Sequence, residues 1–379
     1  MRTLLVTGPG GAGRTTLAAA TALAASLDRT RTLVLSADRG DSLGAALGVV
    51  TGDKPLAVNE FLTAWRPDAS LGFRDDLVRF QERATGALDL LGASRLEGEE
   101  LTSLPGAEEL NLLRALRDAV LSERFELVVV DLPATPQALA LLALPEELRR
   151  YIRRLLPAER QAARALRPVL GRLAGVPMPA EWLYETASRW DTELAAVEAV
   201  LAGPRTGVRI VAEPGPAGTD AVRDARLGLA LRQLRVEALV ANRVLPDEPG
   251  WLAGPVAQQR KALDEWDAVI VPHLGRDPRG TDDLRALAVP PAEVPAPVEW
   301  PVTEQDDVFV WTLPLPGAVR DELDLIRRGD ELVVTVGQFR RIVALPSALR
   351  RCTVEGASLR DGELRVRFVP DPGLWPRER

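Results

Sequence analysis

Apolar residues along the chain fall into short runs, and segments with helical spacing lie between them. Most runs are continuous rather than alternating, as expected for parallel strands that are covered on both faces. Six runs are therefore predicted to be strands, at residues 4–7, 32–36, 127–131, 208–212, 239–242 and 269–272. Helices are predicted at residues 15–27, 108–122 and 220–234. This alternation predicts an α/β fold with a doubly wound, mostly parallel sheet.

Two long segments interrupt the alternation. Residues 58–104 and 145–202 are rich in Leu, Ala, Arg and Glu, and they predict a helical lobe drawn from about 54–107 and 145–203. Within them, residues 144–173 interleave arginines with an apolar stripe. Such a basic amphipathic helix can lie on an anionic membrane or receive an acidic partner. The alternative is a core-facing stripe with a solvated arginine face.

The pattern changes near the C-terminus. Residues 289–302 are dense in proline and predict a stiff, extended linker. Short strands are predicted beyond it, at residues 308–313, 331–336, 339–345 and 364–369, with turn signals at 329–330 and 361–362. The expected organisation is a first domain of residues 1–288, this linker, a small all-β sandwich of residues 303–370 and a tail of residues 371–379.

Composition narrows the class of protein. Hydrophobic residues make up 46% and charged residues 27% of the 379 positions, as in a globular protein of two or three domains. The net charge of −7 gives no argument for nucleic-acid binding. Cys352 is the only cysteine, which excludes an internal disulfide and an intrachain zinc site built from cysteines. Without a recognisable signal peptide or membrane-spanning run, we expect a cytoplasmic protein, with peripheral membrane association as a further option.

The segment GPGGAGRTT, residues 8–16, fits a phosphate-binding loop at every position except the lysine. Glycines let backbone N–H groups turn toward phosphate oxygens, and the helix N-terminus adds partial positive charge. Thr15 would offer its hydroxyl to Mg²⁺. The residues predicted to bind nucleotide here are Gly8, Gly10, Gly11, Ala12, Gly13, Arg14, Thr15 and Thr16. The alternative is a glycine-rich turn that binds nothing.

The whole loop resembles GKGGVGKTT of the ArsA family, which includes the arsenite-pump ATPase and the guided-entry ATPase that delivers tail-anchored membrane proteins. Family members carry two lysines there, and this chain has Pro9 and Arg14 instead. In the family, the first of these lysines reaches across a dimer to the partner's nucleotide. Pro9 offers neither a hydrogen-bond donor nor a charge for that contact. Arg14 keeps the positive charge, but its planar guanidinium group is bulkier than the ammonium group of a lysine. The resemblance therefore implies a deviant Walker A loop with ATP or ADP and Mg²⁺ as ligands. We expect weak or absent hydrolysis by the isolated chain.

Two further segments resemble the switches of this family. The segment SADRGDSL, residues 36–43, is similar to STDPAHSL, which places Asp38 on the acidic residue that positions the attacking water. Its alternative role is a strand-end or turn cap. The segment DLPATPQAL, residues 131–139, parallels DTAPTGHTL, which implies that Asp131 holds Mg²⁺ through water. Asp131 could instead merely cap the next turn. Arg14 and Asp38 are thus the predicted catalytic residues, and Thr15 and Asp131 the predicted metal site.

Base recognition is implied by a second pair of matches. The segment ANRVLP, residues 241–246, resembles VNRVLP of the family, where the asparagine amide reads the adenine edge, so Asn242 is the expected counterpart. The segment PHLGRDPRG, residues 272–280, resembles the loop on the other side of the base and begins at Pro272. The resemblance covers residues 1 to about 290, and its segments occur in the family order.

Residues 306–369 resemble the α-crystallin-like sandwich that some family members carry. This resemblance suggests a surface that holds a polypeptide, and the alternative is an appendage that only stabilises the ATPase domain. For the whole chain we expect a homodimer, or a heterodimer with a related ATPase, and a polypeptide or membrane-protein client. The competing interpretations are a catalytically inactive nucleotide-binding subunit and a holdase-like module. A single cysteine argues against arsenite efflux and against a zinc-clamped dimer.

Overall fold

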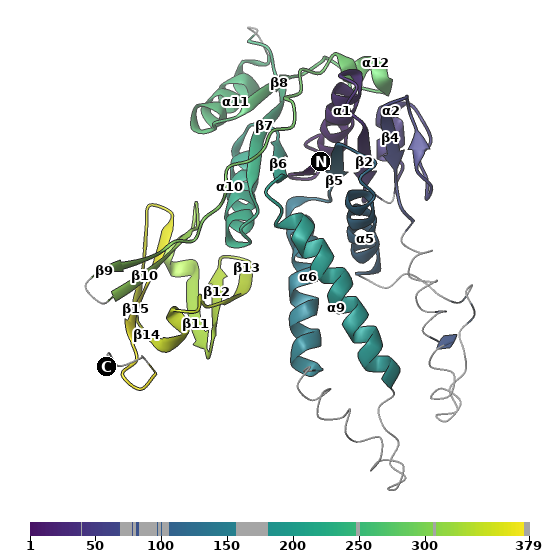
Figure 1. Cartoon of the computed structure of the whole chain (residues 1–379). Helices are drawn as coiled ribbons and strands as arrows, with labels where there is room; N and C mark the ends of the chain where they lie inside the picture. The colour runs from purple at the N-terminus through teal and green to yellow at the C-terminus, as the bar shows by residue number, and fades with distance from the viewer. Residues whose placement is uncertain are drawn as a thin grey trace. The chain divides into compact units, whose positions relative to one another are not determined.

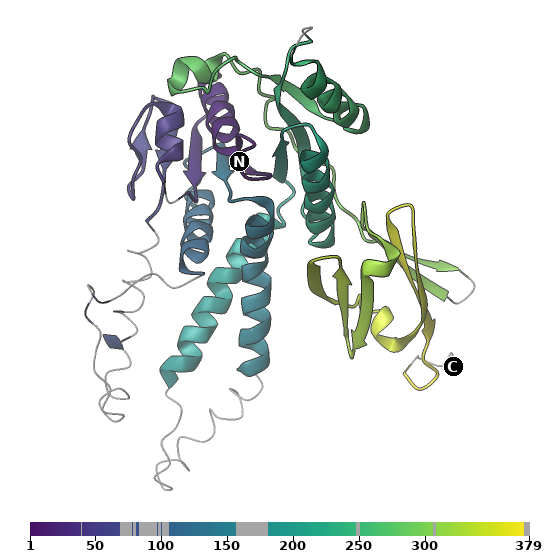
Figure 2. The same ribbon diagram turned by 180° about the vertical axis from the view of Figure 1, so that it is seen from behind.

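The computed structural model describes residues 1–38, 40–68, 78, 81–82, 97, 100, 106–156, 181–247, 251–305 and 308–374 (Figures 1 and 2). The chain divides into two compact units, Met1–Thr206 with Leu274–Ala292, and Gly207–His273 with Glu293–Arg379. The main sheet has eight strands in the order β3-β4-β2-β5-β1-β6-β7-β8, and two smaller sheets lie near the C-terminus. The predicted fold class, a mostly parallel α/β sheet followed by an all-β region, is confirmed.

The strands of the first unit are β1 (Arg2–Thr7), β2 (Thr32–Ser36), β3 (Leu56–Ala57), β4 (Leu62–Trp65) and β5 (Leu127–Asp131). β5 lies between β1 and β2 and runs parallel to both. Its last residue, Asp131, is in register with Val6 on one side and with Ser36 on the other. The continuous apolar runs explain this arrangement, since every residue of β2 and β5 is buried. The pairing brings the C-terminal ends of three strands to one edge.

Helices of the first unit are α1 (Arg14–Leu27), α2 (Ser42–Leu47), α5 (Ala107–Leu121), α6 (Thr135–Leu155), α9 (Glu181–Leu201) and α12 (Gly280–Arg285). A run of buried alanines, Ala18 to Ala20, lets α1 pack closely on β2 and β5. The long helices α6 and α9 lie side by side (Figures 1 and 2). They are joined by Arg149, which pairs with Asp191 at 3.0 Å and also with Glu198.

The prediction of a helical segment from residue 58 is wrong at its start. Residues 62–65 form β4, which pairs in parallel with β2. Leu62 and Ala64 are buried there while Thr63 and Trp65 are half-buried, and this period of two is the signature of a strand. Most of the remaining predicted segment lies outside the described residues, as do residues 157–180, which hold much of the basic amphipathic stretch.

The second unit contains the last strands of the main sheet and the C-terminal sandwich. Its elements are β6 (Thr206–Ala212), α10 (Pro216–Leu231), β7 (Val236–Val244), α11 (Ala253–Glu265), β8 (Val269–Pro272), β9 (Val302–Gln305), β10 (Val308–Pro314), β11 (Leu323–Arg328), β12 (Glu331–Val336), β13 (Phe339–Ala344), β14 (Cys352–Arg360) and β15 (Glu363–Pro370). β6, β7 and β8 are parallel, whereas the strands of both small sheets are antiparallel. In β15, buried Leu364, Val366 and Phe368 alternate with exposed arginines, as predicted.

The sandwich shares one apolar core with α10. Leu227 and Leu231 of α10 belong to the same cluster as Trp311, Val334 and other inward residues of the small sheets. Nη1 of Arg341 donates to the carbonyl oxygen of Leu231 at 2.9 Å, at the C-terminal end of the helix. The same guanidinium lies 5.4 Å from the ring centre of Trp300. The sandwich therefore packs directly against α10 and is not connected to it by the chain alone.

The proline-dense segment is attached to the second unit. The backbone N–H of Glu293 donates to Oε1 of Glu237 at 2.9 Å, and Glu237 forms a buried ion pair with Arg209. A side chain at Gly207 would lie 3.1 Å from the Pro295 ring. Residues 293–295 thus lie against β6 and β7.

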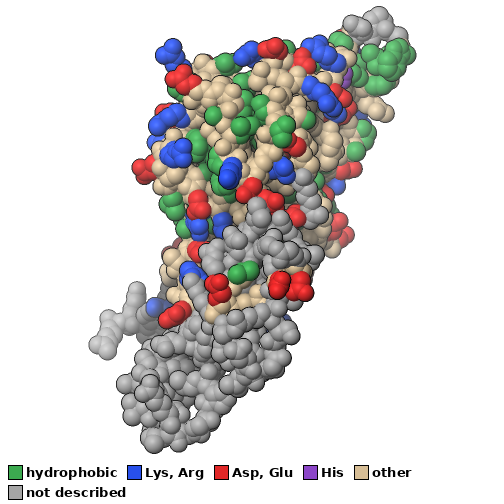
Figure 3. Space-filling view, turned by 90° about the vertical axis from the view of Figure 1, so that its right-hand side faces the viewer, with side chains coloured by type: hydrophobic (Ala, Val, Ile, Leu, Met, Phe, Trp, Pro, Cys, Tyr) green, Lys and Arg blue, Asp and Glu red, His purple; other side chains and the backbone are tan. Residues whose placement is uncertain are grey.

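One face of the molecule carries side chains of both charge signs. On the face drawn in Figure 3, acidic and basic side chains are interspersed with apolar ones. That face therefore presents mixed polar contacts, not a field of one sign. In the described parts of the chain, no helix combines the length and the apolar character needed to cross a bilayer.

Candidate functional site

Residues 8–13 connect β1 to α1 and form an open turn. Gly11 and Gly13 adopt left-handed backbone angles, with φ of 79° and 88°, which favour glycine. A Cβ atom at Gly10 or Gly11 would meet no atom within 4 Å, so space lies above this part of the loop. α1 begins directly after Gly13, without a side-chain cap. Its first N–H groups are of the kind that bind anions at helix N-termini.

The predicted metal residues Thr15 and Asp131 are in direct contact. Thr15 Oγ1 donates to Asp131 Oδ2 at 2.8 Å, and Ser36 Oγ donates to the same oxygen at 2.8 Å. Asp131 is only 3% exposed, and its Oδ1 atom has no hydrogen-bond partner among the described residues. A buried acceptor without a donor is costly unless a ligand or cation satisfies it. The donor set therefore fits a hard cation such as Mg²⁺.

The electrostatics of Asp131 agree with this geometry. Burial raises the pKa of Asp131 to about 6, although hydrogen bonds from Ser36 and Thr15 and the charge of Arg14 act in the opposite direction. A nearby negative charge, Asp38, adds to the increase. A perturbed carboxyl at the end of a buried strand, beside a glycine-rich loop, is typical of a functional site.

Arg14 is the first residue of α1 and points toward the segment that follows β5. Its Nη1 donates to the carbonyl oxygen of Leu132 at 2.5 Å. The same segment accepts from Thr7 Oγ1 at the end of β1, through the Pro133 carbonyl at 2.9 Å, and its Thr135 N–H donates to the Gly8 carbonyl of the loop at 3.1 Å. The predicted second switch is therefore connected to β1, to the loop and to α1.

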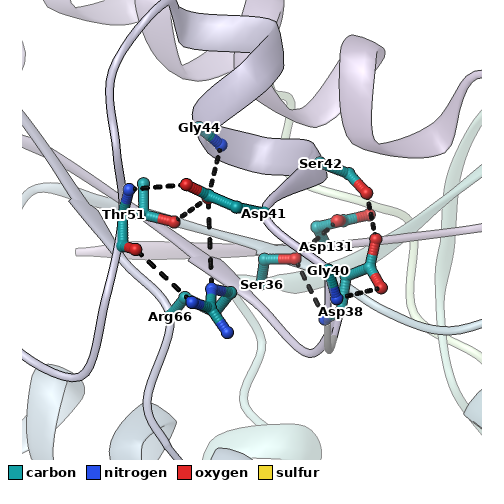
Figure 4. A network of polar contacts seen from close by, with 9 residues as sticks. All are labelled: Ser36, Asp38, Gly40, Asp41, Ser42, Gly44, Thr51, Arg66 and Asp131. Atoms are coloured by element: carbon teal, nitrogen blue, oxygen red, sulfur yellow. Dashed lines mark hydrogen bonds and ion pairs between the residues drawn. The ribbon is translucent and has the colours of Figure 1, made fainter.

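Asp38 follows β2, and its carboxylate is bound to its own loop (Figure 4). Oδ1 accepts from the Gly40 N–H at 3.2 Å, and Oδ2 accepts from Ser42 Oγ. The Asp38 N–H donates to Ser36 Oγ at 3.2 Å. Ser36 thus joins the two predicted acidic residues of the site, Asp38 and Asp131. The sequence interpretation did not single out Ser36 or Ser42, because their partners depend on the strand register.

Asp41 lies where the resemblance places the family's histidine in the predicted first switch, and hydrogen bonds from neighbouring residues hold its carboxylate (Figure 4). It caps α2 by accepting from the Gly44 N–H at 3.0 Å, and it accepts from both the N–H and the hydroxyl of Thr51. The Nε atom of the Arg66 guanidinium lies 4.0 Å from Asp41 Oδ1. Burial acts to raise the pKa of Asp41, but the hydrogen bonds from Thr51 and Gly44 and the charge of Arg66 lower it. The pattern D-S-x-G before a short helix could have revealed this cap.

A cavity of about 360 Å³ brings the predicted catalytic and metal residues together. Its lining includes Arg14, Thr15, Asp38 and Asp131, together with Glu108 and Glu109 from the first turn of α5 and residues 132–134. Sequence analysis did not anticipate the two glutamates, since nothing in their helical pattern relates them to the loop. The cavity thus has a basic side chain near the loop and acidic side chains around it.

The residues predicted to recognise the base belong to the second unit. Asn242 lies in β7 and is buried, and Pro272 ends β8 and is exposed. The two strands are neighbours, with Val244 in register with Pro272. The structure therefore places these two residues at the ends of adjacent strands.

A glycine turn between a parallel strand and a helix, a threonine at the start of that helix and a buried aspartate ending the adjacent strand define a P-loop type of nucleotide-binding fold. The model of a family described as Anion-transporting ATPase, ArsA, matches residues 1–268. A second model, described as an HSP20-like domain found in ArsA, matches residues 306–368. The chain belongs to the ArsA ATPase family.

Relatives align with this chain over nearly the whole of both sequences. An uncharacterized protein of Streptomyces coelicolor is 69% identical over 390 residues, which cover 100% of both chains. A protein of Mycobacterium tuberculosis is 34% identical, over 99% of this chain and 97% of its own. A protein of Aquifex aeolicus, named as an arsenical pump-driving ATPase, is 26% identical, over 97% of this chain and 99% of its own. The resemblance inferred from the loop and switch segments is confirmed at the level of the family.

Proposed function

We propose that this protein is a nucleotide-dependent switch that binds ATP or ADP with Mg²⁺ at residues 8–16 and hydrolyses ATP slowly. Its working cycle gates an interaction with a polypeptide or membrane-associated partner. The observation that carries the proposal is the buried Oδ1 atom of Asp131, for which the described part of the chain offers no hydrogen-bond partner, next to the Thr15 hydroxyl. Family membership supports the same conclusion, because the matched family is one of ATPases.

Each part of the site has a role in this proposal. The N–H groups of residues 10–16 would bind the phosphates, and Thr15 and Asp131 would hold Mg²⁺, Asp131 through water. When bound, the ion would supply positive charge that offsets the charge on the phosphates. Asp38, which lines the cavity, orients the attacking water, and Arg14 places positive charge near the phosphates.

Slow turnover follows from three features of the loop and the predicted first switch. Pro9 removes a donor and a charge at the position of a family lysine. The Arg14 guanidinium donates a hydrogen bond to the Leu132 carbonyl oxygen, and this bond competes with binding to a phosphate. The Asp38 carboxylate is occupied by Gly40 and Ser42. Because phosphoryl transfer depends on positioning and charge, we expect each feature to lower the rate.

A second candidate function is a nucleotide-binding subunit without turnover. It is favoured by Asp41, which fixes the first switch through Gly44 and Thr51 at the position of the family's histidine. Such a subunit would work in a dimer, either with a second copy or with a related ATPase that supplies the missing lysines. Its signature is tight nucleotide binding without phosphate release, and recovery of phosphate release when the partner chain is added.

Arsenite transport is not part of the proposal, although relatives are named as arsenical pump-driving ATPases. Cys352, the only cysteine of the chain, is 1% exposed in the core of the sandwich. Burial raises the pKa of this thiol, although the charge of Arg327 acts the other way. A buried thiol of high pKa is a poor ligand for a soft metalloid.

The test combines calorimetry of Mg·ATP binding with measurement of phosphate release on the full chain. We expect binding in the micromolar range or tighter with little release. Pro9→Lys and Arg14→Lys together are expected to increase release at least about tenfold, by restoring charge at the phosphates. An unchanged rate in the double variant would assign the block to the switches and favour the second function. Absence of binding at millimolar ATP and ADP would refute both.

A further inference from the structure

Two helices whose first turns line the cavity of Asp131 differ in charge. α1 begins at Arg14, and its first turn carries no acidic side chain. α5 begins at Ala107, and its first turn carries Glu108 and Glu109. Arg14 and both glutamates line the cavity. The helix that follows the glycine loop therefore adds positive charge to this cavity, whereas α5 adds negative charge.

The two glutamates change what the N-terminus of α5 can bind. Gly106 precedes this helix with a left-handed φ of 93°, and no side chain caps the helix there. The N–H groups and the partial positive charge of such a helix end attract anions. Two carboxylates in the first turn offset that attraction. A phosphate group is therefore favoured at the start of α1 and disfavoured at the start of α5.

The lining of the cavity as a whole is acidic. Among the described residues that line it, four carry carboxylates, Asp38, Glu108, Glu109 and Asp131, and one, Arg14, carries a guanidinium. All five belong to the first compact unit. The buried Oδ1 atom of Asp131, which accepts no hydrogen bond from the residues that the structure describes, is a separate indication that a cation belongs here. Because nucleotide phosphates carry several negative charges, this lining opposes them unless a cation enters with them.

We propose that Glu109, with Glu108 beside it, is a specificity-determining residue that makes the cavity accept nucleotide with a divalent cation and reject metal-free nucleotide. This inference rests on the proposed nucleotide-binding function and names a determinant of its selectivity. The carboxylate repels the phosphates of ADP alone, whereas a cation bound to the phosphates offsets that repulsion. Repulsion of the wrong ligand is a general source of specificity. The role requires the charge of Glu109 and not its length.

The experiment measures, by calorimetry on the full chain, the dissociation constants of ADP with EDTA and of Mg·ADP. We expect the native chain to prefer Mg·ADP. Glu109→Gln removes the charge at nearly constant shape, and should tighten metal-free ADP about tenfold while changing Mg·ADP by less than about twofold. Glu109→Asp keeps the charge and should retain most of the native preference. The control Asp118→Asn removes an equal charge from α5 outside the lining of the cavity, and should leave both constants unchanged.

Salt dependence separates charge from shape. The tighter binding of metal-free ADP by Glu109→Gln should diminish as the ionic strength rises from about 0.1 M to about 1 M, since salt screens interactions between charges. Glu108→Gln should act in the same direction, and it provides a second variant if Glu109→Gln does not fold. Melting temperatures identify variants that do not fold.

Three results would overturn the proposal. Weaker binding of Mg·ADP by Glu109→Gln, with metal-free ADP unchanged, would make Glu109 a partner of the cation. Parallel changes in both constants would leave stabilisation of α5 as its only role. Equal binding of ADP with and without Mg²⁺ by the native chain would remove the selectivity while the proposed function stands. If the native chain binds neither form, the proposed function itself fails.

Discussion

The hydroxyl of Thr15 donates a hydrogen bond of 2.8 Å to Oδ2 of Asp131, which lies 116 residues further along the chain. Ser36 Oγ donates to the same oxygen, and no donor from the residues that the structure describes contacts the other carboxylate oxygen of Asp131, Oδ1, which is buried. In the absence of a ligand, the ionised form of this side chain therefore destabilises the fold.

The first prediction is that Asp131→Asn stabilises the ligand-free protein. Because the folded-state pKa of Asp131 is raised to about 6, its contribution to stability is fully present below the unfolded value and is lost as the pH rises through about 6. Asparagine stays neutral, so urea denaturation at about pH 7.5 should show a gain of at most about 3 kcal/mol. The gain should shrink as the pH falls toward about 4. A gain that does not vary with pH would contradict the assigned cause.

The same substitution should remove the response to Mg²⁺ and nucleotide. Native protein is expected to melt at a higher temperature with Mg·ADP, because a ligand that binds only the folded state stabilises it. Asp131→Asn should lose most of this increase while retaining its higher ligand-free stability. An equal increase in both proteins would remove Asp131 from the metal site.

The second prediction concerns Gly44 of α2, where the Asp41 carboxylate lies so close that it leaves no room for a side chain. A Cβ atom there would lie 2.4 Å from both Asp41 carboxylate oxygens and 2.5 Å from the Val49 carbonyl oxygen. Gly44→Ala, normally favourable in a helix, should therefore cost about 2 kcal/mol or more of unfolding free energy. Gly254 in α11 has no atom within 4 Å of such a Cβ, so Gly254→Ala is the control and should be neutral or stabilising. Equal effects in urea denaturation would disprove the steric argument.

The third prediction is a pH dependence at the contact between α6 and α9. Burial acts to raise the pKa of Asp191, but Arg149 and Arg153 outweigh it and lower this pKa. Its contribution is therefore present above the unfolded value and is lost as the pH falls through the lower folded value. Asp191→Asn should cost about 1 kcal/mol near neutral pH and little in acid. Asp118→Asn, at a more exposed ion pair with Arg117, should change stability less. The reverse order would be inconsistent with this assignment.

The fourth prediction is that Arg341 fixes the sandwich to α10. Arg341→Met removes the hydrogen bond to the Leu231 carbonyl and the contact with the Trp300 ring, and should cost about 1–2 kcal/mol. Its exposed neighbour provides the control Arg340→Met, for which we expect a change within about 0.5 kcal/mol. Chemical denaturation of the full chain checks both, and a loss confined to Arg340→Met would rule out the assigned role.

Sequence reasoning succeeded where the signal was local and failed where it depended on register. β2 and β5 were predicted with their observed bounds because their apolar runs are continuous and end in polar residues. β4 was missed because its alternation covers only Leu62 to Trp65. Ser36 and Glu109 meet the rest of the site only through folding, so nothing in their own segments marked them. Asp41 carried a local capping signal that a closer interpretation could have used.

The shared core of α10 and the sandwich also limits how the chain can vary. Leu227 and Leu231 would face water if residues 302–370 were absent, so a simple truncation is expected to aggregate. Gene fusion or loss at this junction therefore requires matching changes in the helix. Family members without a sandwich should carry hydrophilic side chains at these two positions, and a survey of their sequences can establish whether the two domains were inherited together.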